Sequence, residues 1–149
     1  MQEPHPGWFE GREHRLPIRV YYEDTDFSGI VYHANYVRFF ERGRSEFLRQ
    51  AGVTHTDLRA SENPIAFAVL RMEIDFQRAA RVDDALVVRT RYKAVKGPRL
   101  FIEQTIERGG EPITQAVVHV ACIDMEGRAR RPPKDLLDRL KDWFFEVEA

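Results

Sequence analysis

The residues of this sequence best suited to chemistry lie within residues 21–36, where acidic side chains and a glycine precede a helix-like pattern. Asp26 and Gly29 fall in the short stretch just before that pattern. Apolar residues or glycine then recur at helical spacing, at Tyr36, Phe40, Gly43 and Phe47. The first N–H groups of a helix lack partners within the helix and carry partial positive charge, which suits a developing oxyanion. A carboxylate beside them can attack an activated acyl group or activate water to do so.

Each of these residues also has a structural interpretation. Carboxylates ahead of a helix often cap its free N–H groups, so spacing alone leaves both a capping and a catalytic role open for Asp26. Asp24 is interpreted as structural. His33, at the expected helix start, could cap the helix, lie on the surface or serve a site. Tyr22 could pack in the core or form the wall of a site.

The elements around this stretch follow from hydrophobic periodicity. Alternation of apolar and polar residues predicts a strand over residues 16–22, and the helical pattern runs from about residue 33 or 35 to Gln50. Gly52 follows where a left-handed helix cap is favoured. Gly43 lies on the apolar face of this helix and costs about 1 kcal/mol relative to alanine. We therefore expect a close approach between the helix and a sheet at Gly43.

The rest of the pattern is dominated by strands, expected over residues 66–77, 86–93, 100–108 and 113–124. A polar stretch over residues 53–64 is expected to be a loop that could hold one helical turn. A short final helix follows two consecutive prolines. Five antiparallel strands and one long early helix predict an α+β domain whose sheet curls around the helix.

Composition restricts the class of protein. With 149 residues, 43% hydrophobic and 32% charged, the chain fits one soluble domain with a substantial core. We expect residues 1–15 to form a flexible tail, because they hold prolines and charges but no apolar run, and residues 16–149 to form the domain. The tail resembles neither a signal peptide nor a transmembrane segment. The net charge of −1 argues against a dedicated nucleic-acid binder.

Cysteine and histidine usage argues against disulfides, metals and cofactors. The one cysteine, Cys122, excludes an intramolecular disulfide and suits a reducing compartment, so we expect a cytoplasmic protein. Cys122 has no helix start or basic neighbour in the sequence and is interpreted as a buried, inert thiol. His5, His14 and His55 lack metal-ligand spacing, and no glycine-rich phosphate loop occurs. We therefore expect no metal and no cofactor.

Three motifs carry a resemblance to a known family: VYYEDTD at residues 20–26, GIVYHANY at 29–36 and FERGR at 40–44. They resemble the hot-dog-fold acyl-CoA thioesterases of the 4-hydroxybenzoyl-CoA thioesterase superfamily, most closely the bacterial Tol-Pal-associated thioesterases. The resemblance spans residues 17–143. It implies a hot-dog fold, in which a five-stranded antiparallel sheet wraps around one long helix and a short C-terminal helix follows. It also implies hydrolysis of acyl-CoA, or of acyl carrier protein thioesters, at sites between protomers of a homo-oligomer, expected to be a dimer of dimers.

The resemblance assigns roles by position. The catalytic carboxylate of the family falls on Asp26, its helix-start histidine on His33 and its site tyrosine on Tyr22. The thioester carbonyl is expected to accept a hydrogen bond from the backbone N–H of His33. Asp26 would then act as general base or as nucleophile, and both roles stay open.

Further substrate contacts are expected beside these residues. Phe27 and Ser28 stand where relatives often have two small residues. Phe27 could fill the acyl path near its mouth or form an apolar wall of it, and we favour the filling role. Gly29 permits a tight backbone approach, and Tyr32 adjoins the helix start.

Basic residues are needed where a site holds the phosphates of coenzyme A. Lys93, Lys96 and Arg99 flank one hairpin, and Arg128 begins a cluster with Arg130 and Arg131. Each could equally be solvated surface charge, and the arginine cluster could instead serve anionic lipid or a carrier protein.

Two other functions compete with hydrolysis. A non-catalytic acyl-thioester sensor or interaction module could use the same fold, because fold alone does not fix function. A hydratase or dehydratase is less well supported, since that chemistry on this fold resembles a different acid–base pattern. Retention of Asp26 with the helix-start sequence favours the thioesterase.

Overall fold

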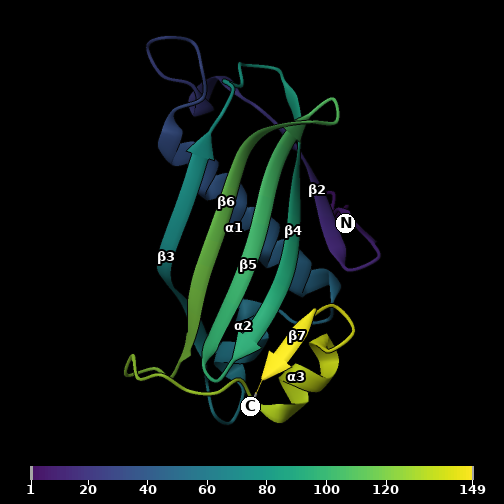
Figure 1. The fold of residues 1–149 in the computed structure, drawn as a ribbon, viewed down its shortest axis with the longest axis vertical. Helices are drawn as coiled ribbons and strands as arrows, with labels where there is room; N and C mark the ends of the chain where they lie inside the picture. The colour runs from purple at the N-terminus through teal and green to yellow at the C-terminus, as the bar shows by residue number, and fades with distance from the viewer. Residues whose placement is uncertain (1, 149) are drawn as a thin grey trace.

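The structure, a computed structural model, describes residues 2–148. A long curved sheet packs against one long helix (Figure 1). The strands are β1 (Trp8–Glu10), β2 (Glu13–Arg19), β3 (Ala66–Phe76), β4 (Ala85–Lys96), β5 (Arg99–Arg108), β6 (Glu111–Ile123) and β7 (Glu146–Glu148). The helices are α1 (His33–Gln50), α2 (His55–Ala60) and α3 (Lys134–Leu140), with a 3-10 turn at Tyr22–Asp24. Within residues 2–148 we find no helix whose length and apolar character would let it span a bilayer.

The sheet confirms the expected α+β hot-dog architecture, with a short C-terminal helix. Its seven strands have the order β1-β2-β4-β5-β6-β3, and β7 pairs in parallel with β4. The named neighbours along that order are all antiparallel. The five expected strands correspond to β2–β6. β1 and β7 are additional, and with three residues each they are too short for alternation to be visible in the sequence.

The expectation of a flexible tail over residues 1–15 is wrong for its second half, which forms β1 and the start of β2. The Phe9 ring centroid lies 5.0 Å from that of Phe47 and 5.1 Å from that of Trp143. His14 is fully buried. These contacts join segments far apart in the chain, so local sequence gives no signal for them. The folded domain therefore begins within the expected tail.

Two element boundaries also differ from expectation. The strand expected over residues 16–22 ends earlier, at Arg19, and Tyr22 instead begins the 3-10 turn. The spacing of Leu140 and Phe144 predicts a last helix that reaches Phe144, but this helix ends at Leu140, although Phe144 is still buried. In both cases the chain continues its apolar pattern after the regular element has stopped.

Helix α1 approaches the sheet closely at Gly43, as expected. A Cβ atom on Gly43 would lie 2.7 Å from Cγ1 of Val88 and 2.9 Å from Oγ1 of Thr90. Both contacts are closer than van der Waals packing allows, so only glycine fits without movement of the sheet. The face of α1 that turns toward the sheet is buried at Tyr36, Phe39, Phe40, Gly43, Arg44, Phe47 and Leu48.

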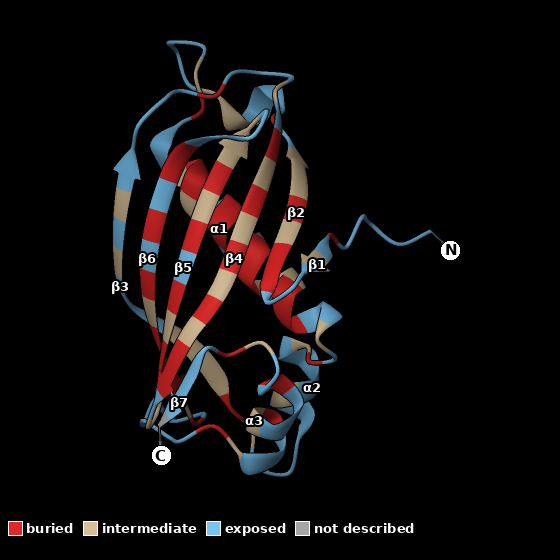
Figure 2. Ribbon diagram, turned by 45° about the vertical axis from the view of Figure 1, so that its right-hand side comes forward, coloured by how far each residue is buried: buried red, intermediate tan, exposed pale blue. Residues whose placement is uncertain are grey.

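Strand β3 forms one edge of the sheet and pairs only with β6 in the described part of the chain. Figure 2 shows β3 with exposed and intermediate residues only, whereas buried residues alternate with intermediate or exposed ones along the central strands. A register shift between Val69 and Arg71 breaks the strict alternation expected there. Val69, Leu70 and Phe76 are about half exposed. A long edge with apolar side chains is a surface suited to pairing with another strand.

The buried His14 is expected to make folding stability depend on pH. Its Nε2 lies 2.9 Å from the Pro6 carbonyl oxygen and 3.0 Å from Oε1 of Gln50. Both are acceptors, so Nε2 carries the hydrogen, and the buried Nδ1 has no partner. Burial lowers the pKa of His14 below 6.5, because a second proton would charge a desolvated ring.

The native state therefore binds fewer protons than the unfolded chain. The free energy of unfolding should be highest above about pH 6.5 and fall as pH drops below it, by up to roughly 1.4 kcal/mol per pH unit. Urea titrations between pH 8 and 5.5, roughly bracketing the ordinary histidine pKa, measure this slope. His14→Gln should flatten it, whereas His55→Gln, at an exposed position, should not. An equal slope in His14→Gln and the unmodified chain would contradict the assignment.

Candidate active site

The loop that carries Asp26 is closed by its own backbone. The Asp26 N–H donates to the Ile30 carbonyl (2.9 Å), and the Gly29 N–H donates to the Asp26 carbonyl (3.0 Å). Gly29 has φ of 82°, a conformation that favours glycine. Ile30 also bridges to Arg81 in the loop before β4. The loop is thus fixed at the end of the sheet where α1 begins (Figure 1).

Ser28 holds the Asp26 carboxylate. Asp26 Oδ1 accepts hydrogen bonds from the Ser28 N–H (2.8 Å) and from the Ser28 hydroxyl (2.5 Å). These bonds stabilise the charged form and lower the pKa of Asp26 below 3.8. The side chain is therefore an ionised, oriented carboxylate at neutral pH, as a general base or nucleophile must be.

Ser28→Ala is expected to shift the pH dependence of catalysis. Loss of the hydroxyl removes the main cause of the lowered pKa of Asp26, so that pKa should rise. Activity that needs the ionised form should then fall at a higher pH on the acidic limb of the kcat/KM profile. Thr25→Val is the matched control, because the Thr25 hydroxyl donates to the Tyr22 carbonyl and not to Asp26. Superimposable acidic limbs for Ser28→Ala and the unmodified chain would refute this role.

The start of α1 has a free backbone donor. The N-cap residue, Tyr32, gives no side-chain hydrogen bond to the helix. Its own N–H donates to the Asp24 carbonyl, and the Asn35 N–H donates to the Tyr32 carbonyl. No acceptor is found for the His33 N–H within residues 2–148. The His33 ring packs on Tyr32, with 4.6 Å between ring centroids.

Two buried residues that sequence reasoning missed hold this geometry. Asn35 Nδ2 donates to the Asp24 carbonyl (2.8 Å), which ties the loop to the first turn of α1. The Tyr36 hydroxyl accepts the Ala80 N–H (3.0 Å), which ties the helix to the loop before β4. Asp24 itself is structural, as expected, because its Oδ2 accepts the Tyr21 N–H (2.8 Å). A polar residue on the buried face of a helix was the available signal for Asn35.

Asp26 and His33 line one cavity of about 360 Å³. Its size is at the lower end of the range usual for small-molecule sites. Its walls combine the carboxylate and the helix start with apolar side chains from the loop and from the end of β3. The lining residues are Asp26, Ile30, Val31, His33, Tyr36, Phe76, Gln77, Arg78 and Ala79.

Other residues expected at the site lie outside this cavity in the single chain. Tyr22 is 85% exposed and Phe27 is fully exposed at the tip of the loop. Phe27 therefore does not fill an acyl channel within one chain, because its ring projects into solvent. Tyr32 is about half exposed, beside His33, and Gly29 shapes the loop without lining the cavity. Roles of Tyr22 and Phe27 in catalysis or binding stay predictions.

The basic residues expected to bind phosphate lie at the opposite end of the sheet. β4 begins near the Asp26 loop and ends at Lys96, and its twelve residues span roughly 36 Å. Lys93, Lys96 and Arg99 surround the β4–β5 hairpin at that far end. Arg128 follows β6, which ends where Ile123 pairs with Ala66 at the start of β3. One chain therefore does not bring these four residues to Asp26.

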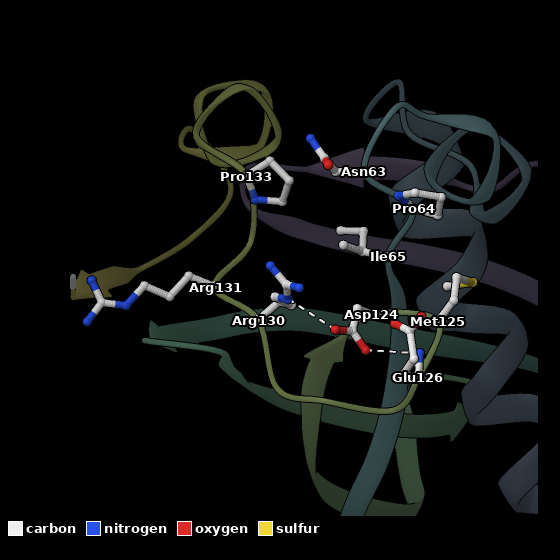
Figure 3. A pocket seen from close by; sticks show the side chains of 9 residues that line it. All are labelled: Asn63, Pro64, Ile65, Asp124, Met125, Glu126, Arg130, Arg131 and Pro133. Carbon is white, nitrogen blue, oxygen red and sulfur yellow. Dashed lines mark hydrogen bonds and ion pairs between the residues drawn. The ribbon is translucent and has the colours of Figure 1, made fainter.

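A second cavity, of about 430 Å³, lies at this far end (Figure 3). The Asp124 carboxylate accepts three hydrogen bonds: one from Nε of Arg130 (3.1 Å) and two from the backbone N–H groups of Glu126 (3.0 Å) and Arg128 (2.9 Å). Figure 3 shows Arg131 extending away from Asp124. Asp124 thus neutralises one member of the arginine cluster and leaves Arg131 without that partner. Among the described residues no group of three or more His, Cys, Asp or Glu side chains could hold a metal ion.

Comparison with known proteins identifies the family. A model of the thioesterase-like superfamily matches residues 20–144. An acyl-CoA thioesterase, YbgC, of Haemophilus influenzae is 46% identical over 110 residues, covering 74% of this chain and 80% of the relative. An acyl-CoA thioester hydrolase, YbgC, of Escherichia coli O6:H1 is 37% identical over 129 residues, covering 85% and 95%.

A solved structure agrees with these relatives. The crystal structure of a probable thioesterase from Bartonella henselae superimposes with a TM-score of 0.79 at 46% identity, covering 81% of this chain and 99% of that one. The family expected from the sequence motifs is thus confirmed, whereas a link to Tol-Pal proteins stays a prediction. The chain belongs to the thioesterase-like superfamily.

Proposed function

We propose that this protein is an enzyme that hydrolyses the thioester of an acyl-CoA, or of an acyl carrier protein, to a free acid and a thiol. One observation carries the proposal: the ionised Asp26 carboxylate and the open start of α1 at His33 line the same cavity. Relatives at 46% and 37% identity are named acyl-CoA thioesterase and acyl-CoA thioester hydrolase.

The geometry serves thioester hydrolysis by either of two routes. With the carbonyl oxygen at the His33 N–H, the helix start stabilises the oxyanion, and one such donor contributes on the order of 10²- to 10³-fold in rate. As a base, Asp26 takes a proton from water, the hydroxide adds to the carbonyl carbon, and the thiolate leaves. As a nucleophile, Asp26 forms a mixed anhydride with loss of the thiolate, and water then hydrolyses the anhydride.

The site is proposed to be shared between protomers. Two copies of the edge strand β3, related by a two-fold axis, would pair antiparallel. β3 spans roughly 36 Å, so its start in one copy would lie beside its end in the other. Arg128 and Arg131 of the partner would then approach Asp26 of this chain. The exposed edge of β3 supports a homodimer, and the resemblance to the family suggests a dimer of dimers. A location in the cytoplasm is part of the proposal.

Phe27 is proposed to take space in the acyl path once two copies assemble. Phe27→Ala should raise kcat/KM for long-chain acyl-CoA relative to short-chain acyl-CoA, by roughly tenfold for each 1.4 kcal/mol of relieved clash. Tyr21→Ala is the control, since it removes another exposed aromatic ring that is not adjacent to Asp26. An unchanged ratio would place Phe27 outside the acyl path, and a lower ratio would make it a wall of that path.

A panel of acyl-CoA substrates tests the function. Thiol release is followed for chains from acetyl to palmitoyl and for aromatic acyl groups, with substrate binding measured in parallel. We expect saturable turnover of at least one substrate, proportional to protein concentration. Tight binding across the panel without turnover would instead identify an acyl-thioester sensor.

A further inference from the structure

A third, smaller cavity lies between α1, α2 and the inner face of the sheet. Its volume is about 110 Å³, and it shares no lining residue with the cavity at Asp26. Its walls are mainly apolar, but four polar side chains reach it from the two helices and one from β4. The lining residues are Glu41, Arg44, Ser45, Leu48, His55, Phe67, Val69, Tyr92, Leu100, Ile102 and Val120.

Arg44 brings a buried positive charge to this cavity. The residue is only 8% exposed, and in the described part of the chain its one hydrogen bond runs from Nη1 to Oε1 of Gln104 (2.9 Å). Gln104 is held in place, because its Nε2 donates to the Phe40 carbonyl (2.8 Å) and to Oγ1 of Thr90 (2.9 Å). A guanidinium has five N–H donors, so four remain. A buried guanidinium whose remaining donors lack acceptors is costly, which favours binding of a negatively charged acceptor there.

The acidic side chain among the lining residues, Glu41, makes its hydrogen bond with Ser45. The Glu41 carboxylate accepts the Ser45 hydroxyl (2.6 Å), and no ion pair joins it to Arg44 within residues 2–148. Because the single hydroxyl proton of Ser45 goes to Glu41, the contact with His55 Nε2 (3.0 Å) is a donation from the histidine to Ser45. Glu41 is therefore held at the exposed rim of the cavity, where its charge acts on Arg44 through space without accepting any of the remaining guanidinium hydrogens.

Tyr92 supplies a second free donor. The residue is buried, and its hydroxyl has no hydrogen-bond partner among the residues that the structure describes. Burial raises the pKa of Tyr92, the nearby Arg44 charge opposes that rise and the Glu41 charge adds to it, so Tyr92 and Arg44 share one environment. Together they offer a cation and a neutral O–H donor to the same small volume, a combination that matches a carboxylate.

We propose that this cavity binds a small monocarboxylate with a short apolar tail. The carboxylate lies on the Arg44 guanidinium and the Tyr92 hydroxyl, and the tail lies among Leu48, Ile102 and Val120. A volume of about 110 Å³ equals that of three or four water molecules at roughly 30 Å³ each, which suits an acid of butyrate size. The inference rests on this cavity alone and does not require the proposed function.

Methyl NMR titration with butyrate tests the proposal. Methyl groups of Leu48, Ile102 and Val120 report this cavity, whereas those of Ile30 and Val31 report the cavity at Asp26. We expect saturable shifts confined to the first group, and none with butyramide, which matches butyrate in shape but lacks its charge. Arg44→Met should weaken binding at least about tenfold, and Tyr92→Phe by roughly three- to tenfold.

Several results would overturn it. Shifts confined to Ile30 and Val31 would place butyrate at the other cavity, and equal binding of butyramide would reduce the cavity to an apolar pocket. An absence of saturable methyl shifts with butyrate would mean that the cavity beside Arg44 holds only water. Unchanged affinity in Arg44→Met or Tyr92→Phe would remove the assigned contacts. If Arg44→Met does not fold, Tyr92→Phe and the butyramide comparison still test whether the cavity binds a carboxylate.

Discussion

Replacement of Asp26 by asparagine is expected to lower kcat by roughly 10²- to 10⁴-fold, the usual contribution of a positioned acid or base. The fold and CoA affinity should be retained, because the loop is closed by backbone hydrogen bonds of Asp26 and Gly29. The amide oxygen can still accept from Ser28, so geometry is preserved while basicity is lost. Steady-state kcat and the Kd for CoA, measured on the same preparation, give the comparison.

Glu23→Gln is the matched control for this substitution. Glu23 is an exposed acid in the adjacent 3-10 turn and does not line the cavity at Asp26. Its replacement removes the same charge from the same region and should leave kcat unchanged. A loss below about tenfold in Asp26→Asn, or an equal loss in Glu23→Gln, would be incompatible with Asp26 as the base or nucleophile.

A lysine at Leu70 is expected to dissociate the proposed dimer and to abolish most activity. Leu70 is 52% exposed on the edge strand β3, and a charge on an edge opposes strand pairing. Across a two-fold axis the two lysines would also repel each other, at a cost of several kcal/mol. The Kd for dimerisation should rise at least about 100-fold, since each 1.4 kcal/mol is a factor of ten. Light scattering and kcat over a dilution series measure both effects.

Val147→Lys is the control for general effects of a surface lysine. Val147 lies on β7 and is 49% exposed, so the change is similar in size, charge and exposure. It should leave both the oligomeric state and the activity unaltered. A monomeric Leu70→Lys protein with full activity would show that one chain holds a complete site.

The sequence was most informative where the signal is local. The helical period around Gly43 predicted the long helix, and the glycine on its apolar face predicted the close approach to the sheet, because such a contact explains a residue of low helix propensity. Alternation gave the five long strands. The carboxylate and the helix start also fall close together in the chain, so Asp26 and His33 were predicted to be neighbours. In the structure both residues line one cavity.

Nonlocal contacts account for most of the differences. β1 is held by Phe9 against Phe47 and Trp143, and neither partner is visible from residues 1–15. The position of Lys96 relative to Asp26 depends on the order and direction of all strands, which charge spacing does not reveal. Tyr22 was expected in a strand but lies in a 3-10 turn, because the strand ends at Arg19.

A single-turnover reaction in H₂¹⁸O tests the central claim, that Asp26 drives attack on an acyl-CoA thioester. The protein is mixed with a limiting amount of the best acyl-CoA of the panel, and the acid, free CoA and the Asp26-containing peptide are analysed by mass spectrometry. We predict equimolar acid and CoA with ¹⁸O in the acid or in Asp26, and neither product on the same timescale in Asp26→Asn. Acyl-CoA that stays bound and intact, or labelled acid formed at an unchanged rate by Asp26→Asn, would contradict the account.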